Sequence, residues 1–319
     1  MNKLYSLGEL LIDFQSVGTA SLKDTEQFVK KAGGAPANVC AQAVKLGCQA
    51  VYLTKVGDDG FGEFLIETLK TIGIDTSFIL KDKNYNTSLA FVSFQANGER
   101  EFSFYRKTAA DLFFTEEDFA KVEFDKDDIF EFGSVALQSD VARKTHLYLI
   151  NKAIKSGATV AFDPNLRFNL WDDLNELKCI VNEYLKFANV VKIGRDELEF
   201  ITDLNGEEAV NKVLECENLK ILLLTDGAEG AKLYVNHHCY FCKGYSVKTV
   251  DTTGAGDSFF GAFLGQLLLN KINKDKLIDD DNDFQKMLEF ACKAGAYTTT
   301  GYGAIQAMGD QESIERMVK

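Results

Sequence analysis

The sequence lacks any surplus of positive charge. Its 319 residues include 35 lysines and arginines against 48 aspartates and glutamates, which gives a formal net charge of −13. This balance argues against nucleic acid or an anionic membrane surface as the main partner. It does not argue against a phosphate site, because main-chain N–H groups can create a local positive field.

The sequence also lacks a membrane-spanning run and a processing signal. Its longest apolar stretch is far shorter than the ~20 residues that cross a bilayer. The N-terminal residues LYSLGELLIDF show no basic leader and no cleavage site, so we expect no signal peptide. The seven cysteines are scattered and odd in number, which is typical of free thiols in a reducing compartment. We therefore expect a cytoplasmic protein.

Several common nucleotide-binding and catalytic motifs are missing. The sequence contains no GxxxxGK[ST] phosphate loop and no GxGxxG after a strand, and GxSxG and HExxH are absent as well. A CxxC runs from Cys239 to Cys242 behind two histidines. No second Cys/His pair follows at zinc-finger spacing, so the segment favours the far end of a hairpin over a zinc or redox site.

The sequence does contain a regular alternation of short strands and amphipathic helices. Helical periodicity is clear at 61–72 and 140–156, and Gly73 follows the first of these. This alternation predicts an α/β fold, with a mostly parallel sheet covered by helices on both faces. Apolar runs typical of buried strands lie at residues 4–14, 50–56, 129–132, 160–162, 190–193 and 221–224.

One region departs from this alternation. Residues 86–106 hold two Phe-rich runs around Asn97-Gly98, which is a strong hairpin signal. We expect a single domain over residues 1–319, in which parts of 15–32 and 86–107 form a small β lid. The apolar side chains of such a hairpin would be exposed if it stood alone, which predicts a homodimer through the lid.

The stretch TVDTTGAGDSFFGAFL at 249–264 gives the strongest functional signal. Gly254 and Gly256 permit a tight turn before an almost wholly apolar helix, so that the amides from Ala255 to Asp257 point at one anion. Those N–H groups and the helix dipole keep Asp257 ionised. The pattern predicts phosphoryl transfer, with Asp257 accepting a proton from the attacking hydroxyl. From this stretch alone, a plain helix cap is the alternative.

Polar residues also follow four of the strand-like runs. Open parallel sheets bind their ligands at the carboxyl edge of the strands, so we expect these side chains to share one site. They are Asp13, Asp163, Asn165, Arg167, residues 192–197 and residues 225–227.

Two motifs together resemble the signatures of the ribokinase-like (PfkB) carbohydrate kinases. GGAPANVC begins at Gly33 and DTTGAGDSFFGAF at Asp251, in the order and at about the separation found in that family. The likeness covers essentially the whole chain, and FDPNLR at 162–167 and EFSFYR at 101–106 are most similar to bacterial fructokinases. The resemblance implies a ribokinase-like fold and ATP-dependent phosphorylation of D-fructose at the 6-hydroxyl.

The resemblance also implies a role for individual residues, and carboxylate and amide groups are suited to fixing a polyol. The residues implied to hold the sugar are Asp13, Gly33, Gly34, Asn38, Arg106 and Asp257. Those implied in the transfer step are Asp257 as general base, Gly254, Ala255 and Gly256 as the anion hole, and Arg167. Those implied to bind the nucleotide are Lys192, Glu197, Thr225, Gly227, Gly230, Gly254 and Gly256.

ATP and Mg²⁺ are the implied cofactors, with K⁺ in some members of the family. Glu197 matches the acidic end of an NxxE motif that orders Mg²⁺ through water, although Gly194 stands where the family has Asn. Asp251 and Thr253 match positions that bind potassium in some members, together with oxygens near residues 298–303.

Three alternatives remain open. Another kinase of the same family, acting on 2-keto-3-deoxygluconate or a similar sugar, would differ only in its hydroxyl-binding residues. Ala35 stands where ribokinases usually have lysine, which argues only against ribose. A non-catalytic sugar sensor would keep the fold, but the intact GAGD with Asp257 argues against it. A nicotinamide-dependent oxidoreductase would need a dinucleotide fingerprint that the sequence lacks.

Overall fold

The computed structural model describes residues 2–94, 100–279 and 281–317. Within those residues the main sheet has nine strands in the order β13-β12-β11-β10-β9-β8-β1-β4-β5. Neighbours from β11 through β5 are parallel, and β12 and β13 pair antiparallel at one edge. The strands are β1 Lys3–Leu7, β4 Gln49–Gly57, β5 Asp75–Asp82, β8 Ile129–Gly133, β9 Thr159–Asp163, β10 Val190–Gly194, β11 Ile221–Thr225, β12 Gly230–Val235 and β13 His238–Lys243.

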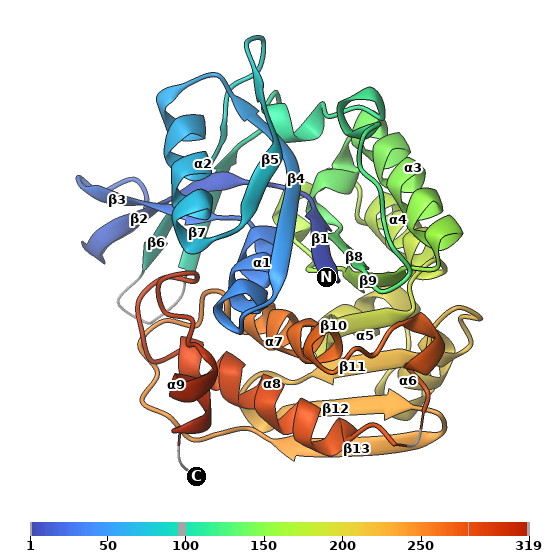
Figure 1. Cartoon of the computed structure of the whole chain (residues 1–319). Helices are drawn as coiled ribbons and strands as arrows, with labels where there is room; N and C mark the ends of the chain where they lie inside the picture. Colours follow the sequence, from blue (N-terminus) through green and yellow to red (C-terminus); the bar gives the residue numbers. More distant parts are fainter. Residues whose placement is uncertain (1, 95–99, 280, 318–319) are drawn as a thin grey trace.

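Helices cover both faces of the sheet (Figure 1). One apolar core lies between the sheet and α1, α2, α7 and α8, and the other lies between the sheet and α3 to α6. In the described part of the chain, no helix is long and apolar enough to cross a membrane. The helices are α1 Ala35–Lys45, α2 Gly60–Ile72, α3 Asp140–Ser156, α4 Leu174–Leu185, α5 Arg195–Thr202, α6 Gly206–Leu214, α7 Ala255–Leu269, α8 Phe284–Thr298 and α9 Gln311–Glu315.

The alternation expected from the sequence is confirmed. The runs at 50–56, 129–132, 160–162, 190–193 and 221–224 are β4, β8, β9, β10 and β11. Helix α2 ends at Gly73, whose φ of 100° is in the left-handed region that glycine adopts without strain. Helix α7 is buried over most of its length, because its residues are apolar on nearly every side.

The run at 4–14 is not one strand, which corrects the expectation from the sequence. It is divided into β1 and β2 (Leu11–Thr19), and the two strands belong to different sheets. The chain turns at Gly8, where a Cβ would lie 2.7 Å from Cγ of Pro36. At the next residue the Glu9 carboxylate accepts a hydrogen bond from the Ala35 amide at 3.0 Å, so a charged group in an apolar run marks the turn.

The small second sheet contains four strands in the order β3-β2-β6-β7 within the described residues. The strands β3 (Phe28–Gly33) and β2 come from one of the two expected segments, and β6 (Ser88–Phe94) and β7 (Arg100–Tyr105) come from the other. β6 and β7 pair antiparallel, as the hairpin signal predicts. The Asn97-Gly98 turn itself lies outside the described residues.

Candidate functional site

The glycine turn opens directly into helix α7. Gly254 has a φ of 77°, and a Cβ on it would lie 2.5 Å from Cβ of Ala304, so both conformation and space require glycine. The Ser258 amide bonds to the Gly254 carbonyl at 2.8 Å, and the Ala255 amide makes a long 3.4 Å contact with the carbonyl of Thr252. Among the described residues, the amides of Gly256 and Asp257 have no acceptor. Two main-chain donors at a helix N-terminus therefore remain available to an anion.

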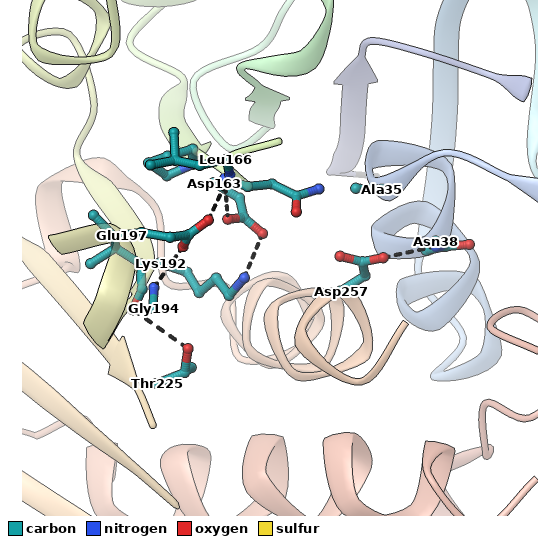
Figure 2. Close-up of polar contacts among 12 residues, drawn as sticks. Ala35, Asn38, Asp163, Leu166, Lys192, Gly194, Glu197, Thr225 and Asp257 are labelled. Atoms are coloured by element: carbon teal, nitrogen blue, oxygen red, sulfur yellow. Dashed lines mark hydrogen bonds and ion pairs between the residues drawn. The ribbon is translucent and has the colours of Figure 1, made fainter. Parts of the chain in front are cut away.

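Asp257 lies in the first turn of α7 and is 9% exposed. Its Oδ2 accepts a hydrogen bond of 2.8 Å from Nδ2 of Asn38, which comes from α1 (Figure 2). The two helices approach closely because Gly261 faces α1, where a Cβ would lie 2.5 Å from the carbonyl oxygen of Val39. Asn38 is thus placed to orient the carboxylate, in addition to its predicted role toward the sugar.

Lys192 lies opposite the turn, in the middle of β10. Its Nζ pairs with Oδ2 of Asp163 at 2.8 Å, and both side chains are buried (Figure 2). Burial acts to lower the pKa of Lys192, but the nearby carboxylates of Asp163, Glu197 and Asp257 outweigh it and raise the pKa. A Cβ on Gly256 would lie 3.1 Å from Nζ, so a permanent positive charge adjoins the free amides.

Glu197 connects two strand ends through its carboxylate. Oε1 accepts from the Leu166 amide at 2.6 Å, and Oε2 accepts from the Gly194 amide at 2.8 Å (Figure 2). A Cβ on Gly194 would lie 3.2 Å from Oε2, so glycine leaves room for the bond. Both oxygens can still accept a hydrogen bond from water, as the predicted indirect contact with Mg²⁺ requires.

Two cavities meet at this point. The first, which we call the glycine-loop cavity, has a volume of about 360 Å³ and lies between the loops after β11 and β13 and the helices α7 and α8. The second, the lid-side cavity, has a volume of about 350 Å³ and lies between the small sheet and the carboxyl edge of the main sheet. Thr225, Thr252 and Gly256 line both cavities, and Asp257 lines the second.

Most of the residues predicted for the site line one of these two cavities. Those that line the glycine-loop cavity are Thr225, Gly227, Gly230, Ala255 and Gly256. Those that line the lid-side cavity are Asp13, Gly34, Asn38, Arg167, Lys192, Glu197, Thr225, Thr253, Gly254, Gly256 and Asp257.

Asp13 brings a carboxylate into the lid-side cavity. Burial raises the pKa of Asp13 to about 7, and the charge of Arg167 partly offsets this effect. At Gly33 a Cβ would lie 2.1 Å from Oδ2 of Asp13, so a larger residue there would displace the Asp13 carboxylate. Gly34, with a φ of 124°, passes so close to Glu9 that a Cβ would lie 2.3 Å from the Glu9 carbonyl oxygen. The two glycines thus allow the backbone to approach whatever fills the cavity.

Arg106 is not among the residues that line either cavity. Its Nη2 pairs with Oδ2 of Asp111 at 2.8 Å, and its Nη1 donates to the carbonyl of Val135 at 3.0 Å and to Oε1 of Gln138 at 2.9 Å. The guanidinium therefore joins the end of β7 to Asp111 and to the segment at 135–138. Its contact with a sugar stays a prediction.

Asp251 and the segment at 298–303 lie together, as the expected potassium cage requires. Oδ1 of Asp251 accepts from the amide of Thr253 at 2.9 Å and from its hydroxyl at 2.6 Å. Oδ2 accepts from the Gly303 amide at 3.0 Å. Over the residues that the structure describes, no group of three or more His, Cys, Asp or Glu side chains is arranged to hold a metal ion. Potassium at this place stays a prediction.

Two carboxylates at the site, Glu9 and Asp163, were missed or underrated in the analysis of the sequence. Glu9 lines the lid-side cavity and is 3% exposed, and its Oε1 caps the N-terminus of α1. Burial raises its pKa to about 7, against the opposing charge of Arg106. The sequence predicted Asp163 only as one of several polar residues at strand ends, and the structure shows that it pairs with Lys192. The signal for Glu9 was a single acidic residue inside an apolar run.

Comparisons with known proteins agree with this geometry. Residues 1–310 match the family described as pfkB family carbohydrate kinase. The chain is 38% identical to a probable fructokinase-5 of Arabidopsis thaliana, over 99% of this chain and 97% of the relative. It is 40% identical to fructokinase-2 of Solanum lycopersicum, over 96% and 92% of the two chains. These relatives are plant proteins, so the likeness to fructokinases is not limited to bacterial enzymes.

Solved structures give the same result. A fructokinase double mutant from Vibrio cholerae, bound to fructose, ADP and a potassium ion, superposes with a TM-score of 0.88 at 29% identity, over 100% of this chain and 99% of that chain. An uncharacterized sugar kinase from Pyrococcus horikoshii superposes with a TM-score of 0.85 at 33% identity, over 99% and 97%. The ribokinase-like fold class expected from the sequence is confirmed.

Proposed function

Because this chain belongs to the pfkB family of carbohydrate kinases, we propose that it transfers the γ-phosphoryl group of ATP to the 6-hydroxyl of D-fructose. Membership of the family and the similarity to nucleotide-bound kinases make it an ATP-dependent sugar kinase. The choice of fructose is supported by relatives named fructokinase and by the Vibrio cholerae structure that holds fructose. The observation that carries the proposal is that Asp257 lines the lid-side cavity next to Gly256, which lines both cavities, at the two free amides.

The geometry suits an in-line transfer between the cavities. ATP binds in the glycine-loop cavity and the sugar in the lid-side cavity, where Asp13 and Arg167 contact its hydroxyls. Asp257, oriented by Asn38, accepts the proton of the attacking hydroxyl. The amides at the start of α7 and the Lys192 ammonium stabilise the charge on the phosphoryl oxygens. The small sheet excludes water, which otherwise competes as acceptor.

Metal ions have suitable residues nearby. Mg²⁺ neutralises charge on the phosphates when it is bound, and Glu197 would hold it through water. Structural neighbours have been solved with ATP and Mg²⁺, or with ADP and calcium or potassium. The oxygens around Asp251 and Thr253 would take a potassium ion, because hydroxyl and carbonyl oxygens are the ligands that such hard cations prefer.

The release of ADP measured across a panel of sugars tests the proposal. Fructose should give the highest kcat/KM, and the product should carry its phosphate on the 6-oxygen. Higher activity with 2-keto-3-deoxygluconate than with fructose would show that 2-keto-3-deoxygluconate is the preferred substrate. The absence of ADP release with every sugar of the panel would favour the non-catalytic sensor.

We also propose that the protein forms a homodimer through the small sheet. Tyr105 of β7 is 64% exposed, and its ring packs against Phe91, which in turn contacts Phe14 and Phe28. Val17 and Val29 add exposed apolar area to the same sheet. A monomeric sedimentation profile at working concentration would exclude this dimer.

A further inference from the structure

Asn165 brings a side-chain amide without a partner into the lid-side cavity. It follows Pro164 after β9, it is only 7% exposed, and it lines that cavity. Its backbone amide donates to Oδ1 of Asp163 at 3.1 Å, but its side-chain amide has no hydrogen-bond partner among the residues that the structure describes. A buried carboxamide costs free energy unless a new partner replaces its hydrogen bonds to water. The partner of this group is therefore expected among the ligands of the cavity.

The backbone around Asn165 is fixed by its neighbours. The φ of Asn165 is 43°, in the left-handed region, which asparagine enters at lower cost than most residues other than glycine. On one side the Pro164 carbonyl accepts from the Ser134 amide at 3.3 Å. On the other side the Leu166 amide donates to Oε1 of Glu197 at 2.6 Å. A rare conformation that is held from both sides sets the direction in which the side chain leaves the backbone.

The charged groups next to this segment carry more negative than positive charge. The Lys192 ammonium pairs with Asp163 at 2.8 Å. The carboxylates of Glu197 and Asp257 lie close enough to raise the pKa of Lys192 as well. One ammonium group does not balance these carboxylates, and a bound nucleotide adds the charge of its phosphates. A cation therefore fits this side of the cavity, and Mg²⁺ is the cation that commonly accompanies nucleotide phosphates.

Asn165 belongs to this side of the cavity. Two residues before it, Asp163 pairs with Lys192, and directly after it the Leu166 amide donates to Glu197 (Figure 2). The carboxylate and the amide side chain implied to hold the sugar come instead from β2 and α1. The place of Asn165 in the chain therefore favours a ligand on the phosphate side over the sugar.

We propose that Oδ1 of Asn165 accepts a hydrogen bond from a water molecule of the Mg²⁺ ion that accompanies ATP, so that Asn165 and Glu197 together hold the hydrated ion; this inference rests on the proposed binding of Mg²⁺ through Glu197. A carboxamide oxygen suits this task, because Mg²⁺ gives up its waters reluctantly and is often held through them. Gly194 has no side chain to offer, and its amide donates to Glu197. Asn165 therefore provides a second oxygen that orients the waters of the ion.

The variant Asn165→Gly tests this role, because glycine adopts a positive φ without strain and only the side chain is lost. The dissociation constant of a non-hydrolysable ATP analogue is measured by calorimetry without sugar, once with Mg²⁺ and once with EDTA. Mg²⁺ should tighten binding to the natural protein. In Asn165→Gly the ratio of the two dissociation constants should fall by about 10-fold, as on loss of a group that orients the ligands of a metal. The dissociation constant in EDTA should not change.

Two further variants separate the side chain from the backbone. Asn236→Gly is the matched control, since Asn236 has a φ of 46°, is exposed and lines neither cavity. It should leave the effect of Mg²⁺ unchanged. Asn165→Asp keeps an oxygen in the same place and should keep the effect of Mg²⁺, and equal loss in Asn165→Asp and Asn165→Gly would overturn the role of Oδ1. An unchanged effect of Mg²⁺ in Asn165→Gly, together with weaker binding of fructose, would show that the amide contacts the sugar instead.

Glu197→Gln distinguishes this inference from the proposed metal site itself. If Glu197→Gln reduces the effect of Mg²⁺ and Asn165→Gly does not, only the inference about Asn165 fails. If Mg²⁺ does not tighten binding to the natural protein, the inference and the proposed use of Mg²⁺ both fail. The measurements need no phosphoryl transfer. Loss of the Mg²⁺ effect in Asn165→Gly, in a protein inactive on every sugar, would therefore support the inference although the proposed reaction had failed.

Discussion

The side chain of Asn38 fixes the direction of the Asp257 carboxylate. Asn38 occupies one oxygen of its carboxylate at 2.8 Å, and the Lys192 ammonium lies across the free amides of α7. A carboxylate held in this way accepts a proton only along the direction that the hydrogen bond leaves open. At the scale of single residues, we therefore expect Asp257 to control proton acceptance, Asp13 to control the pH dependence of sugar binding, and Glu9 to control the pH dependence of stability.

The variant Asp257→Asn removes the proton acceptor and preserves the shape of the side chain. We expect kcat to fall by about 10²- to 10⁴-fold, which is the usual contribution of a positioned general base. ADP release at saturating ATP and sugar measures it, and an unchanged thermal unfolding midpoint confirms folding. Near-normal turnover in the folded variant would mean that the base has been wrongly assigned.

Asp13 predicts a pH dependence of sugar binding. Burial raises its pKa to about 7, so a large share of the carboxyl groups is protonated just below neutrality in the empty cavity. The ionised form accepts hydrogen bonds from sugar hydroxyls, so the KM for fructose should fall as the pH rises from about 6 to about 8. Asp13→Asn should raise this KM and remove its pH dependence. A KM for fructose in the natural protein that stays constant over this range would contradict the prediction.

Glu9 predicts a pH dependence of stability. Its pKa rises from 4.5 in the unfolded chain to about 7 in the fold because of burial, so the folded state favours the protonated form. The contribution of Glu9 to stability is present when the pH is below its pKa of 4.5 in the unfolded chain, and it is lost as the pH rises through its pKa of about 7 in the fold. Between about pH 5 and about pH 8, the free energy of unfolding of Glu9→Gln should rise by about 3 kcal/mol relative to the natural protein. Urea unfolding at each pH measures the free energy of unfolding of both proteins. A difference between the two free energies that does not change with pH would contradict the prediction.

At the scale of elements, the contact between α1 and α7 places the two partners of the Asn38–Asp257 bond. A Cβ on Gly261 would lie 2.5 Å from the Val39 carbonyl oxygen, whereas one on Gly265 would lie 3.1 Å from the end of the Leu46 side chain. The Leu46 side chain can move to make room for an added methyl group, whereas the Val39 carbonyl in the backbone of α1 cannot. The two glycines of one helix therefore offer a matched pair of substitutions.

Gly261→Ala should force the helices apart and cost about 1–3 kcal/mol, which outweighs the gain in helix propensity. It should also lower kcat, because Asn38 moves away from Asp257. Gly265→Ala should change stability less and leave turnover close to normal. Thermal unfolding and ADP release measure the two effects. Equal loss of turnover in both variants would show that this contact does not position the base.

Most elements could be predicted from the sequence because their signals are local. The apolar runs of β4 and α7, the helical period of α2 and the glycine turn at Gly254 depend on neighbouring residues alone. The division of residues 4–14 could not be predicted in this way, since it depends on Pro36 and Ala35 approaching from a later segment. The same holds for the pair of Asp163 and Lys192, because the two residues lie on separate strands, Asp163 at the end of β9 and Lys192 in the middle of β10.

At the scale of the whole molecule, the two cavities share a wall at Gly256, and the small sheet closes one of them. Strand β2 provides Leu11, Asp13 and Gln15 to the lid-side cavity, and β7 provides Phe102 and Phe104. A ligand there contacts strands from both segments of the small sheet. Its binding is therefore expected to order that sheet as a unit.

Fructose together with ADP should slow amide hydrogen exchange in β2, β6 and β7, because openings of the small sheet would have to break contacts with the sugar. The effect should require fructose, and ADP alone should protect the loops around Gly227 and Gly230 instead. Exchange measured by mass spectrometry distinguishes the two regions. Protection of the small sheet by ADP alone would show that it does not cover the sugar.

The passage from β1 to β2 takes only residues 8–10, with Gly8 at its start and Glu9 bonded to α1. Three residues span at most ~10 Å when fully extended, so this connection has almost no slack. Any opening of the small sheet must be a rotation about this short tether, because a translation would tear Glu9 from the end of α1. The connection about which the small sheet would rotate therefore includes Glu9, which also bonds to the N-terminus of α1. A rotation of the small sheet would move α1, and with it Asn38, the partner of Asp257.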